Sequence, residues 1–381
     1  MITHLANRSL TVGRFPTPLK VGLVTPLLKH PGLDTSDYKN FRTITNLTTV
    51  SKILERLALA WLKPHIISSP NYCPLQLTYH SAHSTETALV KMVDDILGCM
   101  DSGSVDISAA FDTVCHQTLV GRLELEFGIH DASLEWVASY LSDRTISVCV
   151  SQSPSAAVSI HVGVPQGSVL GPILFTTYIA PIGRLIEQHG MHYHKYADDT
   201  QLYTSLTVPA GSSLDLLPRC TSELQHWYWA NGLLLNPRKS EMAFFGTKQR
   251  LQRLTLPANV TVARSSVTVN GVLKILGVTL DSTLTFDDHV NNVVRSCNYH
   301  LRALRHLRPC LSLDVAKTMA ASIVGSRLDY CNALFYGVTQ LTMNKLQRQT
   351  TLHVSPAMLV DVKPTQLTYC VTYIGYQYVS G

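Results

Sequence analysis

The chain has 381 residues, of which 45% are hydrophobic and 15% charged, and its formal net charge is +5. This composition excludes a disordered tail, because the apolar content can fill the cores of two or three domains. The charge is mildly basic, so it permits a polyanionic partner without requiring one. Nine cysteines are scattered without a CxxC pair or a zinc-ligand spacing, which favours reduced core thiols in a nuclear or cytosolic protein.

No stretch of the sequence predicts a membrane partner. Residues 1–20 lack the continuous apolar segment of a signal peptide. The most apolar stretch, residues 167–186, is interrupted by Gly171, Pro172 and Pro181, and we expect it to form a buried helix with an unusual entry.

Helical spacing of apolar residues begins early in the chain. Residues 50–66 show it, and we expect that helix to stop at Pro64. Residues 83–100 begin with Ser and Thr as capping residues and carry Glu86 in the first turn, which predicts a second helix.

The middle of the chain mixes two patterns. Helical patterns at 117–127 and 133–142 alternate with β-branched runs at 146–151 and 157–164. This alternation predicts an α/β or α+β fold. From about residue 285 onward the pattern becomes helical, and a separate all-helical unit is expected.

Residues 289–310 carry four arginines and no acid. On a helix, Arg295, Arg302 and Arg305 point away from the apolar stripe of this segment. The face is either an ordinary solvated surface or a contact for a phosphate backbone.

The segment "HKYADDTQLY" sets Asp198 and Asp199 side by side between two β-rich flanks. Adjacent residues of a strand point to opposite faces, so both acids can share a site only where the strand turns. We therefore expect them at the tip of a hairpin. Two close carboxylates repel unless a cation compensates, and a divalent metal would do so; an acidic surface turn is the alternative.

A second acidic stretch, "VDISAAFDTVCHQTL", places Asp106 after Val105. If Asp106 ends a strand beside the hairpin, three carboxylates converge on one pair of metal ions. Phosphoryl transfer uses such an arrangement, in which one ion activates the attacking hydroxyl and the other stabilises the leaving oxygen.

Five segments in chain order carry a family resemblance: "DISAAFDTV", "GVPQGSVLGPILF", "YADDTQLY", "LNPRKSEMAFFG" and "LKILGVTLDSTLTFDDHV". Together they resemble the reverse transcriptases of non-LTR (LINE-type) retrotransposons over roughly residues 20–350. The resemblance implies a right-hand polymerase: a fingers region and entry to the palm at 1–105, a palm at 106–283 and a helical thumb at 284–350. Residues 351–381 do not resemble the usual continuation and are expected to be degenerate or disordered.

The resemblance also implies an activity and its metal site. The chain would be an RNA-directed DNA polymerase that adds deoxynucleoside triphosphates to a DNA primer on an RNA template. Asp106, Asp198 and Asp199, with the backbone carbonyl of Ile107, would bind two Mg²⁺ ions. Lys239 in "LNPRKSE" would protonate the departing pyrophosphate.

Other residues would bind the nucleotide and the nucleic acid. Phe111 matches the aromatic residue that excludes a 2′-hydroxyl. Gln166 and Gly167, in a loop before a helix, would hold the nucleotide and the template base. Lys29 and Arg42 match fingers residues that grip the triphosphate. The arginine face at 295, 302 and 305 would contact the phosphate backbone.

One departure from the family pattern supports an alternative. Before Asp106 the chain offers Asp101-Ser102-Gly103-Ser104-Val105, which is poor material for a central strand. The alternative is a catalytically inactive retrotransposon remnant that keeps the fold and nucleic-acid binding. A two-metal nuclease would also use the acids, but it would leave Phe111 and the "GVPQG" loop without a role.

Overall fold

The computed structural model describes residues 2–78, 83–99, 102–105, 107–108, 113–150, 153–205, 215–236 and 239–354. The chain divides into two compact units. The first comprises Met1–Ser84, Asp94–Phe244 and Gln249–Asn270, and the second comprises Thr85–Val93, Phe245–Lys248 and the chain from Gly271 onward. Within the described ranges, no helix combines the length and the apolar character that a bilayer crossing requires.

One sheet of the first unit is built around β1 (Val21–Leu28), which pairs antiparallel with β2 (Phe41–Asn46). On its other side β1 pairs in parallel with β5 (Arg144–Val150). β5 also pairs with the short strands β6 (Ser153–Pro154) and β7 (Val158–Ile160). The β-branched runs predicted at 146–151 and 157–164 thus form neighbouring strands of this sheet.

A second sheet of the first unit has the strand order β11, β3, β9, β8. Its strands are β3 (Ser102–Val105), β8 (His192–Tyr196), β9 (Asp199–Tyr203) and β11 (Glu241–Ala243). Although Gly and Ser are weak strand formers, β3 lies inside this sheet because β9 and β11 pair with its two edges. Soon after β3 in the sequence, β4 (Ile107–Ser108) pairs with β10 (Leu234–Leu235). Later in the chain, β12 (Asn259–Val262) forms a hairpin with β13 (Ser265–Thr268).

Helices supply about half of the buried apolar residues in the core of the first unit. They are α1 (Ile2–Val12), α2 (Thr49–Ser68), α4 (His116–Leu125), α5 (Asp131–Leu141), α6 (Gly171–Tyr178), α7 (Ile182–Gln188), α9 (Leu216–Ala230) and α10 (Lys248–Arg253), although α10 contributes no buried residue. The residues of α3 (Thr85–Cys99) are divided between the two units. The helices expected at 83–100, 117–127 and 133–142 correspond to α3, α4 and α5. The apolar stretch 167–186 contains α6 and α7, and every residue of α6 except Pro172 is buried.

The expected end of the helix at Pro64 was wrong. α2 begins after the cap Thr48, whose hydroxyl accepts a hydrogen bond from the Ser51 N–H, and it continues through Pro64 to Ser68. A proline costs a helix one backbone hydrogen bond, but burial of Leu62 and Ile66 on either side of it holds the last turn in place. Tertiary packing here outweighs the local preference.

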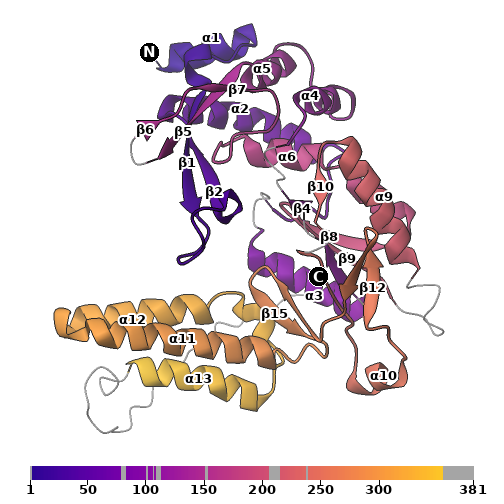
Figure 1. Ribbon diagram of the computed structural model, residues 1–381, viewed down its shortest axis with the longest axis vertical. Coiled ribbons are helices and arrows are strands. Elements are labelled where there is room, and N and C mark those ends of the chain that lie inside the picture. Colours follow the sequence, from indigo (N-terminus) through magenta and orange to yellow (C-terminus); the bar gives the residue numbers. More distant parts are fainter. Residues whose placement is uncertain are drawn as a thin grey trace, which may run out of the picture. The chain divides into compact units, whose positions relative to one another are not determined.

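The second unit consists of a hairpin and a group of helices. β14 (Val272–Ile275) and β15 (Val278–Asp281) are joined by Leu276 and Gly277, with φ of 46° and 84°, as a tight hairpin turn requires. The helices α11 (Asp287–Leu307), α12 (Leu313–Leu328) and α13 (Gln340–Val354) pack on one another, and Figure 1 shows them side by side in orange to yellow. This confirms the helical pattern expected from about residue 285.

The described cysteines are free thiols, as expected. Cys73, Cys220, Cys297 and Cys331 are buried. Cys310 is exposed, however, so its assignment to a core was wrong.

Candidate active site

The two adjacent acids lie at the tip of a hairpin, as predicted. β8 and β9 pair antiparallel with Tyr196 opposite Asp199, so Ala197 and Asp198 form the turn and Asp199 begins β9. Both acids are half-buried. Ala197 has a φ of 57°, in the left-handed region that a side chain with a Cβ disfavours by about 1–2 kcal/mol.

The strained turn is held by Gln76, which sequence reasoning did not single out. The Gln76 side chain accepts a hydrogen bond from the Ala197 N–H (3.1 Å) and donates one to the Ala197 carbonyl (3.2 Å). The Thr78 hydroxyl accepts from the same N–H at 2.5 Å. The backbone around Gln76 runs beside β8, with hydrogen bonds between Leu77 N and Lys195 O and between Lys195 N and Leu75 O. Gln76 lies 121 residues before Ala197, so no local sequence signal points to it.

The strand before the first predicted acid lies directly beside the hairpin. Val105, the last residue of β3, pairs with Thr200, which follows Asp199. Asp106 and Phe111 lie outside the described residues. Ile107 is described through its backbone, which pairs with Leu235 of β10. Within the described part of the chain, no three acidic, histidine or cysteine side chains gather as a metal site.

Lys239 follows β10 by a few residues. Its backbone N–H donates to the Asn236 carbonyl at 3.1 Å, and its side chain is exposed. Lys239 lies between β10, which pairs with the segment that follows position 106, and β11, which pairs with β3, the strand that leads to that position.

The predicted nucleotide loop packs against the β1–β2 hairpin. The Thr45 N–H donates to the Gln166 carbonyl at 2.8 Å. Gly167 has a φ of 100°, and a Cβ there would lie 3.1 Å from the Thr45 carbonyl oxygen. The glycine is therefore required for close packing against β2 as well as for the turn.

The predicted triphosphate-binding cations lie on the same hairpin as Thr45. Arg42 pairs with Leu27 across the hairpin and is exposed. Lys29 directly follows β1, and its Nζ donates to the Lys39 carbonyl at 2.6 Å. The structure therefore brings the Gln166 loop and the strand of Arg42 together.

Glu55 of α2 anchors the other end of that loop. Its carboxylate is fully buried and accepts hydrogen bonds from the N–H groups of Val169 (2.7 Å) and Leu170 (3.3 Å). The hydroxyls of Ser51 and Tyr140 also donate to it, at 3.0 and 3.2 Å. A carboxylate with this many donors fixes the backbone that leads into α6.

Lys195 of β8 is buried behind the acidic turn. Its Nζ donates to the Ile179 carbonyl at 2.9 Å, and burial lowers the pKa of the amine to about 8. On the same strand, His194 lies 2.8 Å from the Asp95 carboxylate and stacks on Tyr203, whose hydroxyl also donates to Asp95. Buried polar contacts of this kind hold β8 and β9 in one position.

The arginine face predicted on the helical segment is exposed. Arg295, Arg302 and Arg305 of α11 all face solvent, and Arg295 donates to the Asn292 side chain at 3.1 Å. Tyr299 is 69% exposed and lies four residues after Arg295 and three before Arg302. The three side chains therefore form one stripe of positive charge with an aromatic ring in its middle.

Comparison with known proteins shows which family the chain resembles. A model of the family described as reverse transcriptase (RNA-dependent DNA polymerase) matches residues 28–280. The RNA-directed DNA polymerase from mobile element jockey of Drosophila melanogaster is 28% identical over 377 residues, covering 92% of this chain and 39% of the relative. A probable RNA-directed DNA polymerase from transposon BS of the same organism is 29% identical over 319 residues, covering 79% and 34%.

This chain thus spans about a third to two fifths of the length of these relatives. Among solved structures, a telomerase from Candida albicans, determined in complex with a fragment of telomeric RNA, matches with a TM-score of 0.43 and 13% identity over 94% of this chain and 63% of that one. The family match confirms the predicted fold class and the resemblance to retrotransposon polymerases. With the model covering more than half of its length, the chain belongs to the reverse transcriptase (RNA-dependent DNA polymerase) family.

Proposed function

We propose that this chain is the polymerase part of a non-LTR retrotransposon protein and that it extends a DNA primer with deoxynucleotides on an RNA template. The observation that carries the proposal is the sheet register: Val105, which precedes Asp106, pairs with Thr200, which follows Asp199. Asp198 is the neighbouring turn residue. The strand that leads to Asp106 thus pairs directly with the strand that begins at Asp199, which supports a shared site for the three carboxylates.

The residues of this site fit a pair of Mg²⁺ ions. Asp198 and Asp199 are half-buried neighbours with only oxygen ligands to offer, which suits a hard divalent cation. Asp106, Asp198 and Asp199, with the Ile107 carbonyl, would hold the metal. When bound, the ions would supply activation of the primer 3′-hydroxyl and stabilisation of charge on the triphosphate. The clamp of Gln76 on Ala197 keeps the acidic turn in one conformation.

The chain's own residues would hold the incoming nucleotide. The Gln166–Gly167 backbone is fixed between Thr45 of β2 and the carboxylate of Glu55. Arg42 and Lys29 would place positive charge against the triphosphate. Phe111 would exclude a 2′-hydroxyl, and Lys239 would donate a proton to the departing pyrophosphate.

The α11 stripe would bind the primer and template. Exposed arginines gain affinity for a phosphate backbone by releasing counterions, and an exposed tyrosine between them adds a ring that can pack on a sugar or base. On this proposal residues 1–105 form the fingers and the entry to the palm, 106–283 the palm and 284–350 the thumb.

Primer extension tests the proposal. The full chain is incubated with an oligo(dT) primer on poly(rA), Mg²⁺ and labelled dTTP, beside Asp199→Asn and the control Asp94→Asn, which removes an exposed carboxylate from α3. We expect Asp199→Asn to lower incorporation by roughly 10²-fold or more and Asp94→Asn to leave it unchanged. Salt-dependent binding of the primed template by the natural chain, without incorporation, would replace this proposal by the inactive remnant.

A further inference from the structure

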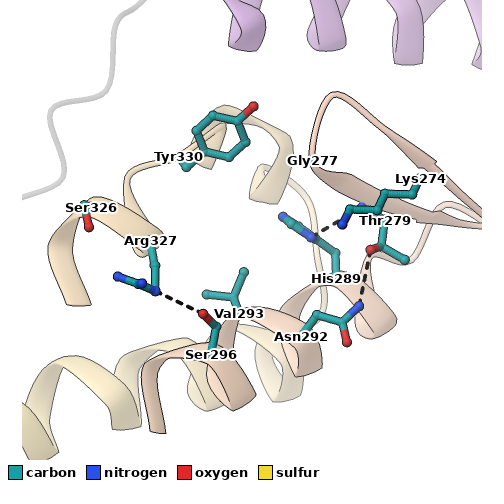
Figure 2. Close-up of a pocket in the computed structure, with 10 residues that line it drawn as sticks. All are labelled: Lys274, Gly277, Thr279, His289, Asn292, Val293, Ser296, Ser326, Arg327 and Tyr330. Atoms are coloured by element: carbon teal, nitrogen blue, oxygen red, sulfur yellow. Dashed lines mark hydrogen bonds between the residues drawn. The ribbon is translucent and has the colours of Figure 1, made fainter. Parts of the chain in front are cut away.

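A pocket with a volume of about 530 Å³ lies within the second unit, between the β14–β15 hairpin, α11 and the end of α12. A pocket of this volume matches the usual range for small-molecule sites. Lys274, His289 and Arg327 supply basic groups to its wall, and no carboxylate occurs among the lining residues, all of which the structure describes. Figure 2 shows these basic groups arranged around one open space, with the Tyr330 ring on the same rim.

Hydrogen bonds between the three elements fix the pocket walls. The Tyr330 hydroxyl donates to the Leu276 carbonyl at the hairpin turn (2.6 Å). The Asn292 side chain donates to the Thr279 hydroxyl (3.2 Å). Across the pocket, Arg327 Nε donates to the Ser296 hydroxyl (3.0 Å). A site held in this way exists before a ligand arrives, so binding requires little ordering of the walls.

His289 gives the pocket a directed hydrogen-bond donor. The Thr279 backbone N–H donates to His289 Nδ1 at 3.4 Å, so the neutral ring carries its proton on Nε2. His289 is 4% exposed, and its Nε2 has no hydrogen-bond partner among the residues that the structure describes. Burial, and then the charge of Lys274, lower the pKa of His289, so the ring is neutral near pH 7. A buried N–H without an acceptor is unfavourable, and a ligand oxygen would satisfy it.

We propose that this pocket binds a phosphate group, either as free inorganic phosphate or as the phosphate of a small nucleotide. Lys274 and Arg327 provide the positive charge, and the buried His289 Nε2–H provides a donor. A divalent cation would find no carboxylate there, and an apolar ligand would leave the His289 Nε2–H without an acceptor. The exposed face of Tyr330 offers a nucleotide base a surface for stacking.

Isothermal titration calorimetry on the full chain tests the proposal, without divalent metal so that the proposed polymerase centre does not bind the probes. The probes are inorganic phosphate, 2′-deoxyadenosine monophosphate and adenosine, which lacks the phosphate. We expect the first two to bind and adenosine not to bind. Lys274→Gln, at an exposed position, should weaken both phosphate probes by about tenfold. Arg348→Gln, which removes an exposed charge from α13, is the matched control and should change nothing.

Two further variants assign the binding to the pocket. His289→Phe keeps a ring but removes the N–H, and it should weaken both phosphate probes, with circular dichroism showing that α11 to α13 remain folded. Tyr330→Leu, which also removes the wall hydrogen bond to Leu276, should weaken the nucleotide more than inorganic phosphate if the ring stacks on the base. Equal affinity of the natural chain for the two phosphate probes would assign the site to phosphate alone. The proposal is overturned if neither phosphate probe binds at millimolar concentration, or if Lys274→Gln binds them as tightly as Arg348→Gln does.

Discussion

Replacement of Gln76 by leucine should loosen the acidic turn. The variant keeps the approximate volume of the buried side chain but removes the hydrogen bonds to the Ala197 N–H and carbonyl. Each bond contributes on the order of 1 kcal/mol net, so we expect the free energy of unfolding to fall by about 2 kcal/mol. The φ of 57° at Ala197 costs about 1–2 kcal/mol. Without the Gln76 hydrogen bonds that offset this cost, we expect the turn to relax and the two acids to move.

Urea unfolding followed by tryptophan fluorescence measures this loss. The four tryptophans, Trp61, Trp136, Trp227 and Trp229, belong to the first unit, so the signal reports the unit that contains the turn. Gln117→Leu, at an exposed position of α4, is the control and should stay within about 0.5 kcal/mol of the natural chain.

Primer extension by the same two variants separates stability from function. With the acids displaced, Gln76→Leu should incorporate nucleotide more slowly even at temperatures where the chain remains folded, whereas Gln117→Leu should not. If Gln76→Leu and Gln117→Leu have the same free energy of unfolding and the same rate of nucleotide incorporation, the Gln76 hydrogen bonds do not hold the turn and the reasoning fails.

Three other changes test separate parts of the structure. Glu55→Gln should lower the free energy of unfolding by about 2–3 kcal/mol, because it replaces a carboxylate that accepts from several buried donors with an amide that has one oxygen acceptor. In the same urea titration, Glu124→Gln, at an exposed position, should have little effect. Because the folded-state pKa of Lys195 is depressed from 10.5 to about 8, its burial destabilises the fold below pH 8 and ceases to do so as the pH approaches 10.5. The free energy of unfolding of Lys195→Met minus that of the natural chain should therefore fall by roughly 3 kcal/mol from pH 7 to pH 10.5. A difference that does not change with pH would contradict the depressed pKa of Lys195. Joint replacement of Arg295 and Arg302 by glutamine should reduce the slope of log affinity for a primed template against log salt by about 2, and an unchanged slope would remove α11 from the interface.

Local pattern predicted much of the architecture. The hairpin at Asp198 and Asp199 followed from two β-rich flanks, and the helices near residues 85, 117, 133 and 287 followed from apolar spacing and caps. Such features depend on neighbours within a few residues, which the sequence displays directly. The end expected at Pro64 failed because burial of Leu62 and Ile66 depends on partners distant in the chain.

The supports of the site could not be predicted in the same way. Gln76 and Ala197 are 121 residues apart, and Glu55 and Val169 are 114 apart. No periodicity links such pairs, so only the folded chain shows that a glutamine clamps the turn and a glutamate holds the nucleotide loop. The weakness of Ser102–Val105 as a strand was also a local judgement, and pairing with strands on both sides compensates for it.

Cleavage of the chain by iron tests the central claim most directly, namely that acids from two distant segments share a metal site. Fe²⁺ bound in place of Mg²⁺ reacts with added hydrogen peroxide to give Fe³⁺, hydroxide and a hydroxyl radical that cuts the backbone close to the ion, and added ascorbate returns the iron to Fe²⁺. We predict cuts both around position 106 and around Asp198 and Asp199, with both sets suppressed by excess Mg²⁺ and by Asp199→Asn. Cuts at the hairpin alone, with the segment around 106 intact, would contradict the shared site.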